Sequence, residues 1–357
     1  MKKNRTKWLK KTFSPLKITG LALLLIALWQ VVGNMHSENN KQLRHQVRQK
    51  IVATFPEQAK VFSQNIGIFP YLKMAQDARP IDLNRPSVVL VHGLDDPGKV
   101  WMNLAPALDT LGYNVWLLNY PNDQPITESS LLFVRELQDL RKRGVTTINI
   151  VAHSMGGLIS RDLLTSPSVQ YKKLQVKDRV PKTNTLIMVA PPNHGSQVAR
   201  LHLLGEIRDH FVRLMNGGAN WLDTFFDGAG EAQIDLLPDS VFLTELNQRP
   251  LPKEVDLLII AGISSPWNKG DITRMKNKIK KIVPEFGQQV DMIGEFMQSM
   301  INGLGDGLVT VDSTRLQGIP HITVKGTHLS MIRNITTESR RVPPAIPVII
   351  KKLAAAK

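Results

Sequence analysis

The sequence predicts an α/β fold built on a mostly parallel, doubly wound sheet. Six short apolar runs rich in β-branched residues each end at Gly, Pro or Ser, as buried strands commonly do. Their hydrophobicity is continuous rather than alternating, so we expect both faces of the sheet to be covered by other elements. The six runs span residues 87–93, 113–121, 147–154, 184–192, 255–262 and 321–326.

Helical patterns between several of these runs support the same fold class. Residues 128–144 carry apolar side chains at positions 131, 134, 137 and 140, and basic residues precede Gly144 at the carboxyl end. This spacing predicts an amphipathic helix that ends at the glycine. Strands alternating with helices are typical of parallel sheets, whose ligands bind beyond the carboxyl ends of the strands.

Composition limits the classes of function. The chain has 357 residues, 42% of them hydrophobic, which is enough for one domain of roughly 250 to 300 residues with extensions. It has no cysteine, which excludes disulfides, thiolate nucleophiles and cysteine-based metal sites. The formal charge is +15, but seven Lys and Arg and no acidic residue lie within the basic tail at residues 1–17. Because so much charge lies in this tail and no nucleic-acid motif accompanies it, we expect no nucleic-acid partner.

An apolar segment follows the basic tail. Residues 18–33 read ITGLALLLIALWQVVG. A basic flank before an apolar run is expected when the amino terminus stays in the cytoplasm and the remainder is exported. Its 16 residues fall between a signal peptide core of roughly 7 to 15 residues and a membrane span of about 20. We expect an uncleaved membrane anchor, with the catalytic domain periplasmic or extracellular; secretion after signal cleavage is the alternative.

The rest of the chain divides by composition into a linker, one large domain and a tail. Residues 34–64 are polar with scattered apolar positions, which suits a stalk or a connecting helix, and we expect residues 34–84 as a whole to be a stalk or linker. Residues 85–340 hold all six predicted strands. Two long connections, near 197–250 and 263–304, predict helical lid or cap insertions over a site. Residues 341–357 have the composition of a basic C-terminal tail.

A serine stands at the junction of a predicted strand and a predicted helix. Residues 152–156 read AHSMG and resemble the G-x-S-x-G nucleophile elbow of α/β-hydrolases, with alanine in place of the first glycine. Small residues flank the serine in that motif because the sharp turn brings neighbouring backbone close. The resemblance implies that Ser154 is a nucleophile; a serine that caps a buried helix is the alternative.

The backbone near this serine offers two donors for an oxyanion. His92 and Gly93 close the first apolar run, and in lipase-like hydrolases a His-Gly pair at this place supplies a donor from the next residue. The resemblance therefore implies an oxyanion hole made by the N–H groups of Leu94 and Met155. The helix predicted to follow Ser154 directs its positive dipole end at the same place.

A nucleophilic serine also needs an acid and a base, which follow it along the chain in that order in this fold. In the last quarter of the chain the histidines are His321 and His328. His328 follows the final predicted strand, whereas His321 begins it, at the wrong end of the sheet. His328 is therefore the expected base. Asp306 and Asp312 both precede that strand, and their positions alone leave both open as the acid.

The end of the chain resembles bacterial triacylglycerol lipases and related esterases. The letters GDGLVTVDS and, later, GTHL match the places where D-G-x-V carries the acid and H-L carries the base in that family. The resemblance covers roughly residues 85–335, includes residues 191–196, and implies Asp306 as the acid and His328 as the base. Calcium-binding members carry an aspartate where Ser330 stands here, so no metal is expected.

These residues predict a membrane-anchored serine esterase or lipase. Ser154, Asp306 and His328 would cleave carboxylic esters, with lipid-like substrates, through an acyl-enzyme and without a cofactor. Acyl transfer or thioester cleavage by the same triad is the alternative, because an acyl-enzyme does not specify its acceptor. A catalytically inactive, lipid-binding protein with a hydrolase fold is the alternative from another class.

Overall fold

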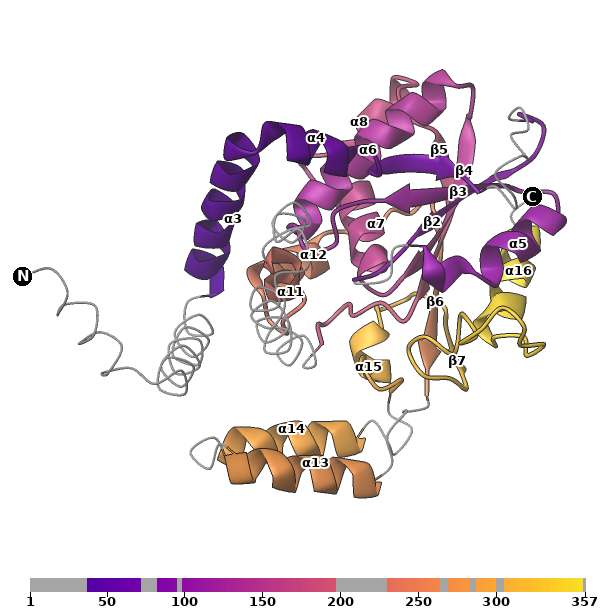
Figure 1. Cartoon of the computed structure of the whole chain (residues 1–357). Coiled ribbons are helices and arrows are strands. Elements are labelled where there is room, and N and C mark those ends of the chain that lie inside the picture. The colour runs from indigo at the N-terminus through magenta and orange to yellow at the C-terminus, as the bar shows by residue number, and fades with distance from the viewer. Residues whose placement is uncertain are drawn as a thin grey trace, which may run out of the picture.

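A seven-stranded sheet lies at the centre of the computed structural model (Figure 1). The structure describes residues 37–71, 82–94, 98–196, 230–263, 269–282, 287–299 and 305–355. Strand order is β1-β3-β2-β4-β5-β6-β7; β1 runs antiparallel to β3, and all other neighbours are parallel. The strands are β1 (Gly67–Pro70), β2 (Ser87–Val91), β3 (Asn114–Asn119), β4 (Thr147–His153), β5 (Lys182–Val189), β6 (Asp256–Gly262) and β7 (His321–Val324). The predicted mostly parallel sheet and its six strands are confirmed.

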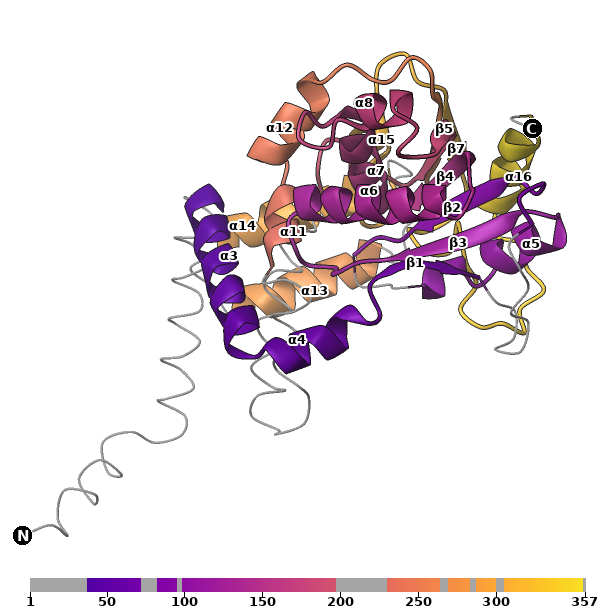
Figure 2. The same ribbon diagram turned by 90° about the horizontal axis from the view of Figure 1, so that it is seen from above.

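Helices lie on both faces of the sheet (Figure 2). Alternate side chains of the inner strands enter two separate cores, one on each face. Val89 and Val91 of β2 belong to one core, and Val88 and Leu90 belong to the other. All four are fully buried, which explains why the run is apolar without alternation. Each core is covered by its own group of helices. The first group is α6 (Ile126–Lys142), α7 (Met155–Thr165), α8 (Tyr171–Val176) and α12 (Val241–Gln248); the second is η1 (Lys99–Trp101), α5 (Leu104–Thr110) and α16 (Ala345–Ala355).

Residues 34–84 contain more structure than the expected stalk or linker. They form helices α3 (Ser37–Thr54) and α4 (Pro56–Ser63) and then strand β1. Ile68 of β1 pairs with Leu118 of β3 and is buried in the sheet core. The sheet therefore begins before residue 85, because β1 supplies its edge strand.

The expected basic tail at residues 341–357 is corrected by helix α16. Ile346, Ile349 and Leu353 recur at helical spacing, so they share one face. That face is buried against the sheet together with Ala345, while Lys351 points into solvent. The segment is part of the domain core because its apolar face covers strands that would otherwise be exposed.

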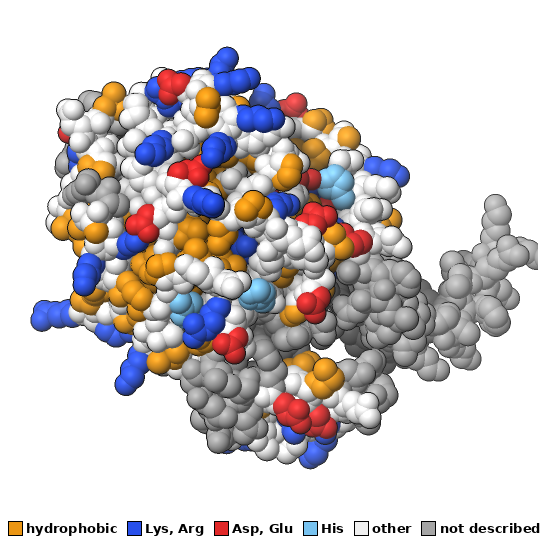
Figure 3. All heavy atoms as spheres, turned by 180° about the vertical axis from the view of Figure 1, so that it is seen from behind, with side chains coloured by type: hydrophobic (Ala, Val, Ile, Leu, Met, Phe, Trp, Pro, Cys, Tyr) orange, Lys and Arg blue, Asp and Glu red, His pale blue; other side chains and the backbone are white. Residues whose placement is uncertain are grey.

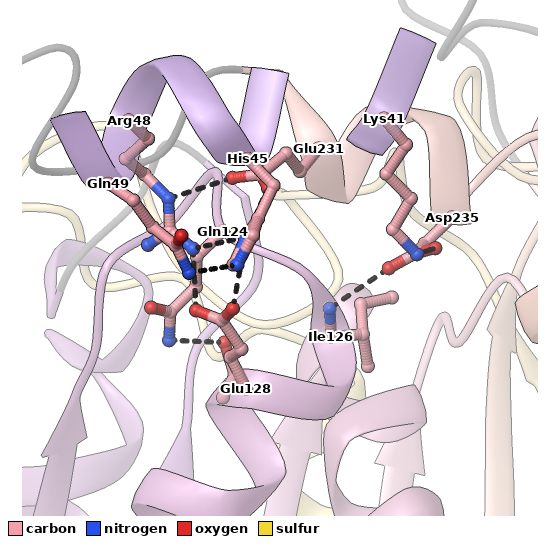
Figure 4. Close-up of polar contacts among 10 residues, drawn as sticks. Lys41, His45, Arg48, Gln49, Gln124, Ile126, Glu128, Glu231 and Asp235 are labelled. Atoms are coloured by element: carbon pink, nitrogen blue, oxygen red, sulfur yellow. Dashed lines mark hydrogen bonds and ion pairs between the residues drawn. The ribbon is translucent and has the colours of Figure 1, made fainter. Parts of the chain in front are cut away.

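Helix α3 is attached to the domain by buried ion pairs (Figure 4). Lys41 Nζ lies 2.5 Å from Oδ1 of Asp235, at the end of α11 (Glu231–Asp235). The other carboxylate oxygen of Asp235 accepts the N–H of Ile126, the first residue of α6, at 3.0 Å. Since Asp235 is fully buried, one carboxylate joins α3, α6 and α11.

A second group of charges lies beside the first (Figure 4). Arg48 of α3 lies 3.0 Å from Glu231 and 2.6 Å from Glu128 of α6. His45 Nδ1 lies 3.0 Å from Glu231 Oε1. Burial raises the pKa of Glu231, and the nearby Arg48 opposes that shift. Three cationic or ionisable side chains of one helix therefore face carboxylates from two others.

The two long connections contain helices where the structure describes them. Residues 230–250 form α11 and α12, and residues 269–299 form α13 (Lys269–Ile282) and α14 (Gly287–Ser299), which pack as a hairpin (Figure 1). Residues 197–229 of the first insertion, the basic tail at 1–17 and the apolar segment at 18–33 lie outside the described residues. Among the helices that the structure does describe, none combines the length and apolar character needed to cross a bilayer.

Basic side chains are dispersed on the face shown in Figure 3, where acidic and apolar groups separate them. In the described part of the chain several cations form ion pairs, such as Arg141 with Asp178 and Lys352 with Asp256. This face therefore offers no continuous basic stripe of the kind that follows a phosphate backbone.

Candidate active site

Ser154 occupies a sharp turn between β4 and α7. Its backbone has φ 54° and ψ −127°, a conformation that costs a non-glycine residue of the order of 1–3 kcal/mol. Its N–H donates to the carbonyl of Val189 at 2.8 Å, and its carbonyl accepts the N–H of Gly157 at 2.9 Å. Between Ile148 and Leu163, Ser154 alone is partly exposed. The turn therefore presents the serine at the surface of a closely packed core.

Glycines around Ser154 allow the backbone to approach closely. A side-chain carbon added at Gly156 would lie 2.4 Å from the carbonyl oxygen of Val91 and 2.5 Å from that of His92. One added at Gly93 would lie 2.7 Å from the Cβ of Ser154. Such distances are sterically forbidden, so glycine is required at both places. The turn and the end of β2 are thus in direct contact.

His328 and Asp306 form a hydrogen-bonded pair beyond the carboxyl end of the sheet. His328 Nδ1 lies 2.8 Å from Asp306 Oδ2, and both side chains are buried. The other carboxylate oxygen, Oδ1, accepts the N–H groups of Leu308 and Val309, each at 2.9 Å. A carboxylate can only accept, so it assigns the proton to Nδ1 and leaves Nε2 as an acceptor in the neutral ring.

Asp312 lies away from this pair. Its side chain is 91% exposed and lies 3.5 Å from Arg315 within the same turn, α15 (Val311–Thr314). Of the two candidate acids, the structure brings Asp306 to His328 and directs Asp312 into solvent.

His153 joins the serine turn to the histidine loop. Its Nε2 lies 3.0 Å from the carbonyl oxygen of His328, and the centres of the two rings are 4.7 Å apart. Burial, and then the electrostatic interaction with His328, lower the pKa of His153 well below its ordinary value. His153 is therefore neutral and donates from Nε2. This bond links the loop that carries His328 to His153, the residue that precedes Ser154 in the chain.

The two predicted oxyanion donors belong to chain segments that meet at the serine turn. Met155 is the first residue of α7, so its N–H has no acceptor within the helix. Leu94 follows Gly93, where an added side-chain carbon would lie 2.7 Å from the Cβ of Ser154. The positive end of the α7 dipole adds to the same place. This arrangement suits a negative charge that develops on an oxygen next to Ser154.

Comparison with known proteins gives the same fold. Residues 88–289 match the alpha/beta hydrolase family. The chain belongs to this family. A comparison with curated protein sequences gives no match.

Two solved lipase structures are similar to this alpha/beta hydrolase. The mature lipase of Bacillus licheniformis has 19% identity and a TM-score of 0.50, over 80% of this chain and 97% of that one. The lipase of Staphylococcus hyicus has 12% identity and a TM-score of 0.52, over 79% of this chain and 97% of that one. At these identities the similarity concerns the fold.

Sequence reasoning missed how the hydrolase holds the Asp306 loop. Ser196 Oγ donates to the carbonyl of Leu308 at 2.6 Å, and Ser313 Oγ donates to that of Gly195 at 2.6 Å. Asn193 Nδ2 donates to the carbonyl of Thr314 at 2.7 Å. The segment at 191–196, singled out above only by resemblance, therefore fixes the acid-bearing loop from both ends.

Two glycines, Gly262 and Gly326, also set the position of this loop. Their importance follows from distances in the folded structure and not from a sequence motif. A carbon added at Gly262, at the end of β6, would lie 2.7 Å from the Cβ of Asp306. One added at Gly326, after β7, would lie 2.9 Å from the backbone of Met331. Because the loops on either side approach so closely, the acid and the base segment pack directly onto the strand ends.

Other histidines serve structural purposes or lie outside the described residues. His321 Nε2 lies 2.8 Å from Thr314 Oγ1 at the start of β7, and His202 and His210 are not described. Ser330 Oγ accepts the N–H of Thr327 at 2.8 Å, so it closes a turn at the place where calcium-binding lipases carry an aspartate. Within the ranges that the structure describes, no group of three or more His, Asp and Glu residues gathers to hold a metal ion.

Proposed function

We propose that this alpha/beta hydrolase cleaves carboxylic esters. Ser154 is the nucleophile, His328 is the base, and Asp306 is the acidic residue of the triad, whose carboxylate orients His328. The observation that carries the proposal is the buried 2.8 Å contact between Asp306 and His328. This contact lies beyond the carboxyl ends of the strands, and Ser154 occupies a strained, partly exposed turn at the carboxyl end of β4. A buried acid, an oriented imidazole and a strained serine at one edge form the constellation that acyl transfer needs.

The reaction proceeds in two halves. Ser154 Oγ attacks the ester carbonyl carbon while His328 Nε2 takes its proton, and the N–H groups of Leu94 and Met155 bind the resulting oxyanion. The intermediate collapses, and His328 gives the proton to the leaving alcohol. Water then attacks the acyl-enzyme, gives a proton to His328, and the carboxylic acid leaves as Ser154 regains that proton. Asp306 stays ionised throughout and stabilises the imidazolium.

A lipid-like ester is the favoured substrate class. The two similar structures are lipases, and residues 18–33 have the composition of a membrane anchor or signal segment. An exported, membrane-anchored enzyme would meet lipid esters at the bilayer surface. Acyl transfer and thioester cleavage use the same acyl-enzyme, and they are separated from ester hydrolysis by the acceptor and the leaving group.

Activity-based labelling of the full chain tests the proposal. We expect cleavage of p-nitrophenyl acyl esters and fluorophosphonate labelling of Ser154, with both lost in Ser154→Ala by on the order of 10⁴-fold or more. Ser168→Ala, which changes an exposed serine after α7, is the matched control and should keep both. Activity that persists in Ser154→Ala refutes the assignment. A folded wild-type chain that binds lipid without cleaving any ester would favour an inactive lipid-binding protein.

Substrate panels then refine the class. Esters of increasing acyl length separate a lipase from a short-chain esterase. Parallel reactions with thioesters and with added alcohol acceptors show whether the acyl group passes to water or to another acceptor.

A further inference from the structure

The side chain of His92 contacts the peptide group that would bind the oxyanion. His92 is the residue after β2 and is 1% exposed. Its Nδ1 lies 2.8 Å from the carbonyl oxygen of Gly93. A carbonyl oxygen only accepts, so Nδ1 carries the proton and donates to it.

This bond determines the direction of the Leu94 N–H. The Gly93 carbonyl and the Leu94 N–H belong to one planar trans peptide, in which they point in opposite directions. Because His92 holds the carbonyl, the Leu94 N–H points away from the His92 ring. Rotation of this peptide would break the bond from Nδ1 and withdraw the donor. A side-chain carbon added at Gly93 would lie 2.7 Å from the Cβ and 3.3 Å from the Oγ of Ser154, so the peptide group that His92 holds begins at a residue packed closely against the serine.

His92 is itself held in place by Tyr120, which follows β3. The two rings stack with centres 4.3 Å apart and planes 6° from parallel. The Tyr120 hydroxyl donates to the carbonyl oxygen of His92 at 2.6 Å. Tyr120 is also buried. Both the ring and the backbone of His92 are therefore fixed by one neighbouring residue.

The charge state of His92 suits this constant role. Burial lowers the pKa of His92 to about 4, although the bond to Gly93 opposes the shift. The ring is thus neutral at all pH values where the proposed base would work, and it keeps one proton for the Gly93 carbonyl.

We propose that His92 is a positioning residue that orients the Leu94 N–H of the oxyanion hole. Tyr120 fixes the position of the His92 ring and backbone. From the sequence alone, the His92-Gly93 pair predicts only a backbone donor at the next residue, Leu94. The proposal rests on the proposed hydrolase function, because an oxyanion hole has meaning only where Ser154 reacts.

Two variants of nearly equal shape isolate the hydrogen bond. Asn at position 92 places an amide donor where Nδ1 stands, whereas Leu has a similar shape and no donor. Both remove the ring that stacks on Tyr120, so their difference reports the hydrogen bond. We expect His92→Leu to lower kcat by about 10- to 100-fold with KM nearly unchanged, because a misaligned oxyanion donor loses transition-state binding alone. His92→Asn should keep kcat within about 3-fold of wild type if its donor restores the orientation.

The measurements use the full chain, with kcat divided by the number of sites that fluorophosphonate labels at completion. This division corrects kcat for any loss of folded protein. A purely structural role of His92 would reduce the amount of folded protein but not the turnover of each labelled site. We also expect His92→Leu to weaken binding of an alkyl boronic acid, which forms a tetrahedral adduct on the serine, in proportion to the fall in kcat/KM. Equal kcat per labelled site in wild type and His92→Leu would overturn the proposal, as would equal losses in the Asn and Leu variants.

Tyr120→Phe gives an independent answer if neither His92 variant folds. It keeps the stacked ring and removes the hydroxyl that binds the His92 carbonyl. We expect a fall in kcat of about 3- to 10-fold at constant KM, and an unchanged kcat per labelled site would overturn the proposal. If the wild-type chain neither cleaves esters nor is labelled at Ser154, the proposed function itself is wrong, which is a distinct result.

Discussion

Asp306 Oδ2 and His328 Nδ1 lie 2.8 Å apart although 22 residues separate them in the chain. The second oxygen of Asp306 is held by two backbone N–H groups, so the carboxylate is fixed in the orientation in which its Oδ2 accepts the hydrogen bond from His328 Nδ1. The backbone N–H of His328 also donates to the Asp306 carbonyl at 3.0 Å. Acid and base are therefore coupled through both their side chains and their backbones.

Replacing this acid should impair turnover far more than replacing its neighbour. Asn at 306 can present its amide to His328 Nδ1 and favour the wrong tautomer, so we expect kcat to fall on the order of 10²- to 10⁴-fold. Asp312→Asn changes an exposed side chain and is the matched control, with kcat within about 2-fold of wild type. Steady-state ester hydrolysis checks both variants. The reverse order of effects would transfer the role of acid to Asp312.

Ser154→Gly should be more stable than Ser154→Ala, although both are inactive. Glycine tolerates the positive φ of this turn, whereas alanine keeps the strain. After allowing for the greater freedom of glycine in the unfolded chain, we expect a gain of about 1 kcal/mol in the free energy of unfolding. Urea unfolding followed by circular dichroism measures the difference. A glycine variant that is less stable than the alanine variant would show that the turn is unstrained.

The Lys41–Asp235 pair should show strong coupling in a double-mutant cycle. Lys41→Met leaves a fully buried carboxylate without its cation, so this single change should be destabilising. Because the partner charge is already absent, Lys41→Met should cost much less in the background of Asp235→Asn, with a coupling of about 1–3 kcal/mol. Lys50→Met changes an exposed lysine of the same helix and should cost little. Additive effects of the pair would mean that α3 is not held by this contact.

Asp235 should also give stability a pH dependence of known sign. Burial raises its pKa in the folded state, and Lys41 only partly offsets that effect. The folded state therefore holds the Asp235 proton more tightly than the unfolded state, whose pKa is about 3.9. This contribution to stability is full below that value and is lost as pH rises through the folded pKa. We expect the stability of wild type relative to Asp235→Asn to decline over this range in urea titrations; a rise would contradict the raised pKa.

Helix α16 should be necessary for stability. Ile349 is fully buried against the sheet, so Ile349→Ala should cost about 2–4 kcal/mol in the free energy of unfolding. Val342→Ala alters a side chain that is 63% exposed and should cost less than about 0.5 kcal/mol. Thermal or urea unfolding compares the two. Equal stabilities of the two variants would mean that this segment is a tail that does not contribute to the domain core.

The inner strands could be predicted because burial on both faces leaves an unbroken apolar run in the sequence. Strand β1 could not, because it is four residues long, lies at an edge and has two exposed positions that include Pro70. A proline is tolerated at such an edge, but it disrupts the sequence signal. Helix α16 was obscured by its lysines and by the prolines before it, although its apolar residues do recur at helical spacing.

The pairing of Asp306 with His328 was predicted from the sequence, but the contacts that support the pair were not. Ser154 and His328 follow from motif and chain order, while the choice of Asp306 depended on resemblance. What separates the two aspartates physically is a pair of backbone N–H groups from Leu308 and Val309, and no local pattern reveals them. The buried carboxylates of α11 are still less predictable, since Lys41 lies 194 residues from Asp235.

The antiparallel pairing of β1 with β3 also bears on how pieces of this protein would behave in solution. A fragment that began at residue 82 would leave the outer backbone groups of β3 uncovered. An open edge of this kind is a template for strands of other molecules. Such a fragment would keep all of the sequence that matches the family, yet it would be prone to self-association and aggregation through that edge.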